Sequence, residues 1–241
     1  MATRPRARDQ KRAALERLEI FSAFGDAELT ALAQLAQLRR YGKGRTLVVQ
    51  GAVTETTFGI VSGRLRVSLG RANGSEATLA ILGPGELVGE LGLFQDGSRS
   101  AHVTALEDAC VLSVAKSAVL RALERSPAAS LALCRLLASR LRQFAQHFEE
   151  VTAMPVEQRL ARKLVFLAAR WGEPAAGGVG ISLKLSQQEL AELVDTSRQS
   201  ANKCLAKWRK SGILASSTRK VVIRDLRALR LCAGTSGSTF S

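Results

Sequence analysis

The most informative stretch of this sequence is SQQELAELVDTSRQSANKCLAKWRKSGIL, which spans residues 186–214. Ser186 and Glu189 stand in the pattern S-x-x-E, the capping box that predicts the start of a helix. Ser197 predicts the N-cap of a second helix, and Gly212 predicts its end, because glycine readily adopts the left-handed conformation of the C′ position. Two short helices joined by so small a turn predict a helix-turn-helix.

The residues that follow, ILASSTRKVVIRD at 213–225, predict a strand, a polar turn and a second strand, which together form a wing. The second helix begins with polar side chains, and the N-terminal residues of such a helix reach base edges in the major groove of DNA. Arginine can donate two hydrogen bonds to guanine, glutamine and asparagine can pair with adenine, and lysines further along suit phosphates. The residues expected to contact DNA are Arg198, Gln199, Ser200, Asn202, Lys203, Lys207, Arg219 and Lys220.

The charge of the chain supports this interpretation. The 241 residues include 35 Lys and Arg against 21 Asp and Glu, for a net charge of +14. Residues 1–12 hold five bases and one acid, residues 13–159 hold 16 bases and 15 acids, and residues 160–241 hold 14 bases and five acids. A winged helix that contacts proteins through a merely solvated basic face is the alternative. So large an excess beside a helix-turn-helix favours double-stranded DNA as the partner.

Several classes of protein are excluded by what the sequence lacks. It has no apolar run of the ~18 residues that span a bilayer, and no apolar stretch follows the basic N-terminus, so we expect neither a membrane segment nor a signal peptide. With no Ser/His/Asp set, no metal-ligand cluster and no P-loop, we expect no enzyme and no metal. The widely spaced cysteines favour a reducing cytoplasm. They are Cys110, Cys134, Cys204 and Cys232, and the two histidines are His102 and His147.

The middle of the chain has the texture of a β domain. Short β-rich runs alternate with Gly, Asn and Asp turns at roughly ten-residue spacing, which predicts an antiparallel sandwich or barrel. A short helix with Asp26 as its N-cap is predicted before it, at 26–37. After the β domain we predict a helix at 116–124, a helix at 155–171 with Pro155 at its N1 position, and a loop at 173–180. The predicted strands are 46–50, 57–62, 64–69, 77–82, 101–106 and 110–115.

A long helix is predicted from Ser126, as N-cap, to about Met154, where Pro155 ends it. Apolar residues along it alternate at spacings of three and four, the a/d pattern of a two-helix seam, which favours self-association over packing on its own domain. A redox role for Cys134 on this seam is an alternative to that of a small buried apolar residue. The predicted dimer seam is Cys134, Leu137, Leu141, Phe144, Phe148 and Val151.

A second constellation lies in GELGLFQDGSRSAHV, residues 89–103. Gly89 lets the backbone approach a ligand, and residues 91–94 can form one helical turn whose free amides suit an anion. Arg99 could add two charge-assisted hydrogen bonds to the same anion, and Glu90 is useful there only if it accepts from sugar hydroxyls. A glycine-rich β turn with a surface arginine is the alternative.

The pattern GELGLF-x-x-x-x-RSA resembles the phosphate-binding cassette of cyclic-nucleotide-binding domains, which are eight-stranded jelly rolls flanked by helices. With the seam helix and SRQSANKCLAKW, the chain from about Phe21 to Arg230 resembles the cyclic-AMP receptor, or Crp/Fnr-type, family of bacterial transcription regulators. The resemblance implies that Glu90 binds the ribose 2′-hydroxyl and that Arg99 and Ser100 bind the cyclic phosphate. The ligand-binding residues expected by position are Gly89, Glu90, Leu91, Arg99, Ser100, Ala101, Phe144 and Ala145.

The chain departs from the family pattern at two places. Phe144 and Ala145 stand where the cyclic-AMP receptor offers a Thr–Ser pair to the adenine amino group. With no hydroxyl at these positions, cyclic GMP, or a cyclic AMP whose adenine is held by packing alone, becomes more plausible as the effector. Asp195 replaces the glycine of the helix-turn-helix turn, a position whose left-handed conformation aspartate tolerates. The first cysteine is Cys110, which excludes the N-terminal iron–sulfur cluster of oxygen sensors, and two histidines support no heme.

The expected fold is therefore α+β, with a cyclic-nucleotide-binding jelly roll, a long dimerisation helix and a winged helix-turn-helix. The expected function is that of a ligand-gated transcription regulator that binds a palindromic operator as a homodimer and contacts RNA polymerase. Constitutive DNA binding, a response to another small molecule, and a regulatory subunit of a protein partner are the alternatives. The expected divisions are a disordered basic arm at 1–18, the β domain at 19–125, the seam helix and hinge at 126–154, the DNA-binding domain at 155–233 and a disordered tail at 234–241.

Overall fold

The chain divides into two compact units, Met1–Phe144 and Ala145–Ser241. The computed structural model describes residues 7–53, 55–72, 74–94, 98–215 and 220–234, so the predicted tail lies outside the described residues apart from Gly234. Across these ranges, no helix combines the length and the apolar character needed to cross a membrane.

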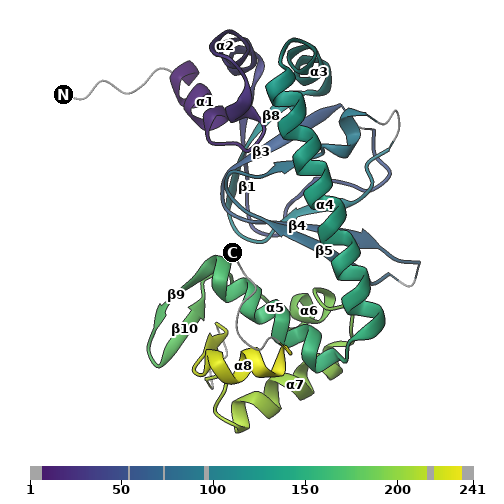
Figure 1. The fold of residues 1–241 in the computed structure, drawn as a ribbon, viewed down its shortest axis with the longest axis vertical. Helices are drawn as coiled ribbons and strands as arrows, with labels where there is room; N and C mark the ends of the chain where they lie inside the picture. Colours follow the sequence, from purple (N-terminus) through teal and green to yellow (C-terminus); the bar gives the residue numbers. More distant parts are fainter. Residues whose placement is uncertain (1–6, 54, 73, 95–97, 216–219, 235–241) are drawn as a thin grey trace, which may run out of the picture. The chain divides into compact units, whose positions relative to one another are not determined.

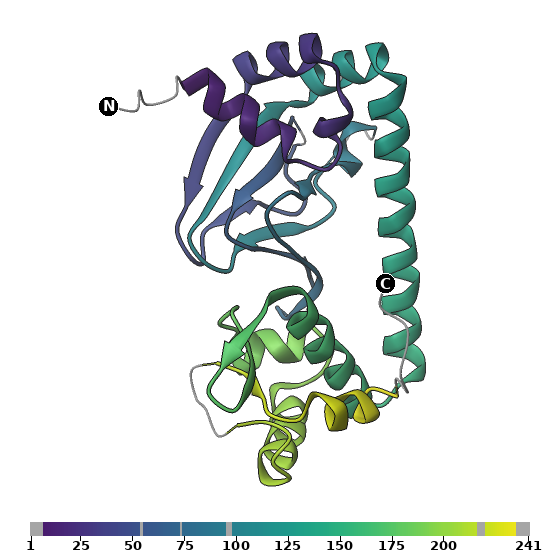
Figure 2. The ribbon, with the colours of Figure 1, turned by 60° about the vertical axis from the view of Figure 1, so that its left-hand side comes forward.

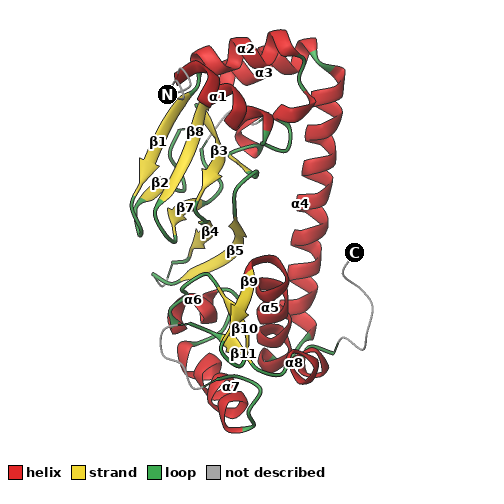
Figure 3. Cartoon of the chain, turned by 90° about the vertical axis from the view of Figure 1, so that its left-hand side faces the viewer, coloured by secondary structure: helices red, strands yellow, loops and turns green. Residues whose placement is uncertain are grey.

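Two four-stranded antiparallel sheets form the body of the first unit (Figure 3), in the strand orders β1-β8-β3-β6 and β2-β7-β4-β5. This order is that of a jelly roll and confirms the predicted antiparallel sandwich. The strands β1 and β6 were not predicted, because one is mostly polar and exposed and the other has two residues. The strands are β1 (Gln37–Tyr41), β2 (Thr46–Val48), β3 (Thr56–Ser62), β4 (Leu65–Gly70), β5 (Glu76–Leu82), β6 (Leu87–Val88), β7 (His102–Ala105) and β8 (Ala109–Ala115).

An apolar core fills the space between the two sheets. Phe58 and Val111 reach it from one sheet, and Leu65 and Val103 reach it from the other. Because successive strand residues point to opposite faces, Leu112 next to Val111 turns outward and packs against helices instead. Strand β8 is therefore buried on both faces along most of its length.

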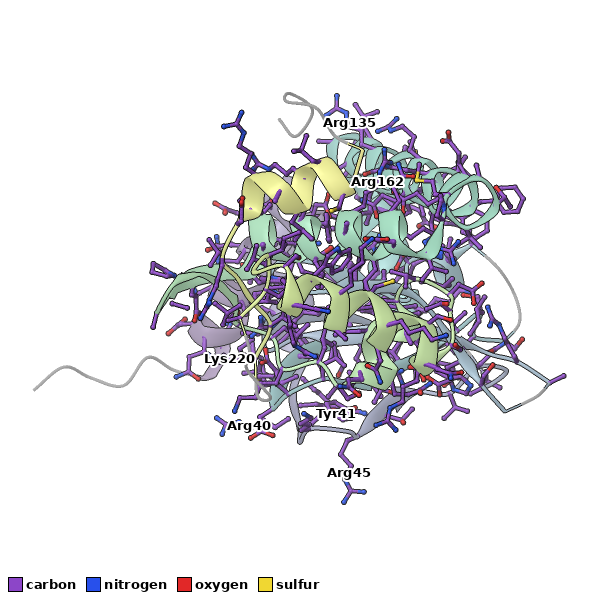
Figure 4. The ribbon with its side chains drawn as sticks, turned by 90° about the horizontal axis from the view of Figure 1, so that it is seen from below. Arg40, Tyr41, Arg45, Arg135, Arg162 and Lys220 are labelled. Carbon is purple, nitrogen blue, oxygen red and sulfur yellow. The ribbon has the colours of Figure 1, made fainter. Side chains whose placement is uncertain are left out.

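Strand β1 lies at the edge of its sheet and pairs only with β8. Arg39 and Arg40 on this strand are exposed, and Figure 4 shows Arg40 and Arg45 projecting from the β domain. Charged side chains on an edge strand oppose further strand pairing, because their burial in a neighbouring sheet would remove them from water.

Helices gather at one end of this sheet, where they contact β8 (Figure 1), and the first of them overturns a prediction. We expected residues 1–18 to form a disordered arm, but the described part of that range forms α1 (Ala7–Glu16). Leu15 is 0% exposed and Leu18 is 2% exposed, both within the helical core. The sequence interpretation weighed the basic side chains and overlooked these apolar ones.

The remaining helices of this layer are close to their predicted positions. They are α2 (Asp26–Leu35), α3 (Lys116–Arg125) and the start of α4 (Pro127–Ala153), with short 3-10 turns η1 (Phe21–Ala23) and η2 (Leu91–Leu93). Gly25, not Asp26, is the N-cap of α2, and the Asp26 carboxylate instead accepts a hydrogen bond from Arg12 at 2.6 Å. The Ser126 hydroxyl accepts from the Ala129 amide at 3.3 Å, which confirms Ser126 as the cap of α4.

The second unit (Figure 2) is built on α5 (Val156–Trp171), whose N-cap, not N1 residue, is Pro155. The helices α6 (Gln187–Glu192) and α7 (Arg198–Lys210) form the predicted helix-turn-helix, and α8 (Leu226–Cys232) packs on α5. Arg162 donates to the Ala233 carbonyl at 3.0 Å, beside α8 (Figure 4).

A small antiparallel sheet completes this unit, in the order β11-β10-β9. The predicted loop at 173–180 is wrong, because β9 (Gly172–Ala175) and β10 (Gly178–Ile181) form a hairpin there. Gly177 and Gly178 have φ values of +84° and +149°, which allow the tight connection that the glycine-rich sequence concealed. The predicted wing is present as a bridge between Leu214 and β11 (Val222–Ile223), although its turn at 216–219 lies outside the described residues.

The end of α4 at Ala153 confirms that Pro155 terminates the helix. The compact units nevertheless separate at Phe144–Ala145, earlier than the predicted boundary at Met154–Pro155. Side chains of α5 explain the difference, because Arg159 and Arg162 bond to Val151 and Glu150 in the last turns of α4, and Arg159 also bonds to Met154 directly after it. Those turns therefore belong with the second unit.

The assignment of α1 to the core is tested by Leu15→Ala. This variant should lower the free energy of unfolding by about 2–5 kcal/mol, since a buried leucine is replaced by a cavity. Arg8→Ala on the exposed side of the same helix should change it by less than about 0.5 kcal/mol. Urea unfolding followed by circular dichroism measures both, and equal midpoints for the two variants would contradict the assignment.

Candidate functional site

The backbone of the 89–103 segment turns sharply after β6. Gly89 has φ +86°, and a Cβ atom at this position would lie 2.4 Å from Arg99 Nη1 and 3.3 Å from the Thr56 carbonyl oxygen. Only glycine fits so close an approach. The next residues form the 3-10 turn η2 (Leu91–Leu93), which confirms the predicted helical turn, while residues 95–97 lie outside the description.

Arg99 is 9% exposed and points into this turn. Its backbone is held by two hydrogen bonds, from its amide to the Ala52 carbonyl at 2.7 Å and from the Gly51 amide to its own carbonyl at 2.9 Å. Its Nη2 donates to the Thr56 carbonyl, and its guanidinium lies 5.8 Å from the centre of the Phe58 ring. Among the described residues, its buried Nη1 has no hydrogen-bond partner.

This environment fits an anionic ligand. Burial lowers the pKa of the Arg99 guanidinium below its ordinary value, and the nearby Glu90 carboxylate acts in the opposite direction. A buried guanidinium with an unpaired nitrogen is costly, and an anion that accepts from Nη1 would remove that cost. The alternative, a surface arginine on a glycine-rich turn, does not match the burial of Arg99.

Sequence reasoning missed Arg140, which explains how an acid can stand beside this site. Arg140 on α4 lies 4.0 Å from Glu90 and 3.9 Å from Glu86, and it donates to the Leu87 carbonyl at 3.3 Å. It therefore compensates the charge of Glu90 and holds that carboxylate at the rim of the turn. The sequence offered one sign of this role, because Arg140 lies one helical turn before Phe144, which was predicted to bind the ligand.

The other predicted ligand-binding residues are not all in one place. The structure brings Gly89, Glu90 and Arg99 together, with Leu91 and Ser100 exposed and Ala101 buried beside them. Phe144 and Ala145 are exposed on α4, so a role for them in ligand binding stays a prediction.

The predicted seam faces solvent in the single chain. Leu141, Phe144 and Phe148 are 69%, 56% and 64% exposed, although the first half of α4 buries Leu133 and Leu136 on another face. Cys134 is exposed as well, and Leu137 and Val151 are half-buried. Leu137 packs against the core of the β domain, so the alternative of packing on its own domain holds for that residue and not for Leu141, Phe144 and Phe148. The role of Cys134 stays a prediction.

The helix-turn-helix has the caps that its sequence predicts. The Ser186 hydroxyl accepts from the Glu189 amide at 3.1 Å while the Glu189 carboxylate accepts from the Ser186 amide at 2.7 Å. The Ser197 hydroxyl accepts from the Ser200 amide at 3.1 Å. Between the helices, Asp195 has φ +50°, the left-handed conformation expected of the residue that replaces glycine.

A buried arginine that sequence reasoning did not single out joins the end of α4 to this turn. Arg159 is 9% exposed and donates to four backbone carbonyls. Two of them, Val151 at 3.3 Å and Met154 at 2.8 Å, end α4, and two, Val194 at 3.0 Å and Asp195 at 3.2 Å, form the helix-turn-helix turn. Nothing in the local sequence marks it, because its partners come from both sides of α5.

Most of the predicted DNA-contacting residues are exposed. Lys207 also pairs with Glu157 at 2.9 Å, which raises the pKa of Lys207. Asn202 is half-buried, and its Nδ2 donates to Gln187 on α6 at 2.9 Å, so we revise its predicted role as a base reader. Arg198, Gln199, Lys203, Lys207 and Lys220 (Figure 4) are exposed, Ser200 is half-buried, and Arg219 lies outside the described residues.

The described ranges contain no group of three or more His, Cys, Asp or Glu side chains that could hold a metal ion.

Comparisons with known proteins agree with both sites. Residues 38–126 match the family model of the cyclic nucleotide-binding domain, and residues 158–232 match that of the Crp-like helix-turn-helix domain. Homologues at this level are transcription regulators, not enzymes.

Two curated relatives cover nearly the whole chain. The "CRP-like cAMP-activated global transcriptional regulator" of Mycobacterium tuberculosis is 29% identical over 215 residues, which are 89% of this chain and 96% of that protein. The "Cyclic AMP receptor protein" of Thermus thermophilus is 29% identical over 210 residues, 87% of this chain and 94% of that protein. A solved CRP-family regulator of Thermus thermophilus is similar with a TM-score of 0.72 and 26% identity, covering 82% of this chain and 97% of that one.

The bridging role of Arg159 is tested by Arg159→Met, which keeps the side-chain volume but removes the donors. Four carbonyls lose their partner, so the second unit should lose about 2–5 kcal/mol of stability. Both tryptophans, Trp171 and Trp208, lie in this unit, so urea unfolding followed by tryptophan fluorescence reports on it alone. The exposed Arg227→Met is the control, and unchanged stability of Arg159→Met would refute the bridge.

Proposed function

We propose that a cyclic nucleotide controls the binding of DNA by this chain, which belongs to the Crp/Fnr family of transcription regulators. The observation that carries the proposal is the unpaired, buried Nη1 of Arg99 in a turn that only glycine can form. A cyclic phosphate there would accept from Arg99 and from the backbone amides at the start of η2.

The sugar of the ligand would lie against Glu90. An ionised carboxylate only accepts hydrogen bonds, so Glu90 suits the ribose 2′-hydroxyl as donor, and Arg140 keeps the carboxylate in place. No hydroxyl is available at Phe144 or Ala145 for an adenine amino group, so cyclic GMP and cyclic AMP are both candidates. A constitutive regulator, or one that answers another small molecule, is the alternative.

We propose the homodimer on the ground of the exposed seam of α4. Three large apolar side chains at a/d spacing, Leu141, Phe144 and Phe148, face solvent in the single chain. A second copy of the helix would bury them in the manner of a two-stranded coiled coil. Two copies would present two recognition helices, and matching successive major grooves about 34–36 Å apart requires a palindromic operator.

Ligand and DNA are coupled only by the difference in ligand affinity between the two states of the dimer. A response of about 100-fold corresponds to about 2.7 kcal/mol of coupling. Arg159 is placed to transmit it, since it bonds to the end of α4 and to the helix-turn-helix turn. We further propose RNA polymerase as a partner and the cytoplasm as the location, as the family resemblance implies.

The ligand is tested by calorimetric titration of cyclic AMP and cyclic GMP into the full chain. Wild type should bind at least one of them, and Arg99→Leu should bind it about ten- to 100-fold more weakly, because one charge-assisted hydrogen bond is worth about 1.5–3 kcal/mol. Arg45→Leu, on the exposed surface of the same domain, should bind as wild type does. Absence of heat with both nucleotides would remove the ligand from the proposal and leave the DNA binding.

The DNA interface is tested with two lysines of α7. Lys203→Ala should lose discrimination at one base pair, worth about 1–3 kcal/mol, because Lys203 stands near the start of the recognition helix. Lys210→Ala should weaken binding to all sequences alike and reduce the salt slope by about 1, because Lys210 at the far end suits a phosphate. Binding to an operator library at several salt concentrations separates the two outcomes. If the two variants changed base preference and salt slope in the same way, the placement of the start of α7 at the bases and of its far end at a phosphate would be contradicted.

A further inference from the structure

The contact between α6 and α7 contains a pair of side-chain amides that the predicted site did not include. Asn202 Nδ2 donates to Gln187 Oε1 at 2.9 Å. The Asn202 Oδ1 atom is buried and has no hydrogen-bond partner within the described residues. The oxygen of Asn202 is thus withdrawn from solvent and its amide nitrogen is engaged with α6, so the bidentate contact with adenine that the sequence suggested is not available in this conformation.

The same oxygen of Gln187 has a second neighbour. Arg198 Nη2 lies 3.5 Å from Gln187 Oε1, at the long limit of a hydrogen bond. Arg198 and Asn202 are four residues apart on α7, so their side chains leave the same face of the helix and approach α6 together. One amide oxygen is therefore the shared acceptor for two neighbouring residues of the recognition helix.

Gln187 can serve as a fixed acceptor because its backbone is fixed. It is the first residue of α6, directly after Ser186, and the capping box formed by Ser186 and Glu189 sets the conformation of this turn. The firm bond to Asn202 then holds the Gln187 amide in one orientation. Arg198, in contrast, is exposed and carries a long side chain with many rotamers.

We infer that Gln187, fixed by Asn202, is a specificity-positioning residue for Arg198. The Gln187 oxygen restrains the Arg198 guanidinium at the start of the recognition helix, where it can donate to a single guanine edge. Without that restraint the flexible arginine can also reach neighbouring bases or phosphates, which adds affinity for wrong sequences. The inference rests on the sequence-specific DNA binding described above and adds the residues that sharpen it.

The chain offers a matched control in the adjacent glutamine. Gln188 Nε2 donates to Glu192 within α6 at 2.9 Å and makes no bond to α7 among the described contacts. Gln187→Ala and Gln188→Ala remove the same group from neighbouring positions of one helix, but only the first removes the acceptor of Arg198.

The experiment measures binding of the full-length protein to a randomised operator library, with the base preference resolved at each position. Arg198→Ala identifies the base pair that Arg198 contacts, as the one where preference collapses. Gln187→Ala should reduce preference at that same base pair by about three- to tenfold, as a partial loss of a bidentate contact, and nowhere else. Gln188→Ala should leave it unchanged, and affinity for nonspecific DNA and the salt slope should be the same in wild type and both glutamine variants.

A swap of the two amides distinguishes positioning from a merely structural role. The double variant Q187N/N202Q retains an amide pair of the same combined length between α6 and α7 but withdraws the acceptor oxygen from Arg198, which is already 3.5 Å away. It should therefore keep the wild-type melting temperature without recovering the preference that Gln187→Ala loses, and a full recovery would indicate a merely structural role. A uniform loss of affinity across all sequences, a loss that follows a lowered melting temperature, or a Gln188→Ala effect of equal size would each overturn the inference. Wild type without any base preference would overturn the sequence-specific function itself, whereas a wild-type preference untouched by Gln187→Ala overturns only the role of Gln187.

Discussion

One helix, α4, is shared by the two compact units of the chain, and its side chains must satisfy both. Its first turns bury Ala129, Leu133 and Leu136 in the core of the β domain. Arg140 in its middle compensates Glu90 at the ligand turn. Its last carbonyls are bonded by Arg159 of the DNA-binding unit.

Buried arginines carry this arrangement, and each has a different task. Among the described residues, Arg99 Nη1 has no hydrogen-bond partner, which suits this nitrogen to donate to an anionic ligand. Arg159 donates its four hydrogen bonds to backbone carbonyls, which suits it to join two segments without a counter-ion. A planar guanidinium with several donors can serve both purposes, whereas a lysine ammonium could not span four carbonyls in different directions.

The net charge of +14 divides along the same lines. The near-neutral residues 13–159 hold a site that depends on a few buried charges, while the exposed cations of α7 belong to the basic residues 160–241. The basic residues at the N-terminus have another setting than expected. Arg12 forms ion pairs with Glu16 and Asp26 on the surface of a folded helical layer, so its charge is used within the first unit.

Sequence patterns predicted correctly the features that depend on residues close together in the chain. The capping box at Ser186, the cap at Ser197 and the left-handed Asp195 were all predicted, because such caps involve residues three or four apart. The hairpin at β9–β10 and helix α1 were missed for the opposite reason. A strand of GEPA composition forms only because β10 lies beside it, and α1 is held by Leu15 and Leu18 against distant helices.

The sequence by itself determined the types of the main elements, the caps of α4, α6 and α7, the distribution of charge and the two motifs that define the family. Only the tertiary structure decided which polar side chains are buried and what they bind. The bonds of Arg99 to Thr56, Arg140 to Leu87 and Arg159 to Val194 join residues 43, 53 and 35 positions apart. The same holds for Asn202, which its sequence position assigns to DNA and its fold assigns to Gln187. Burial depends on what the rest of the chain brings alongside, and no local pattern contains that information.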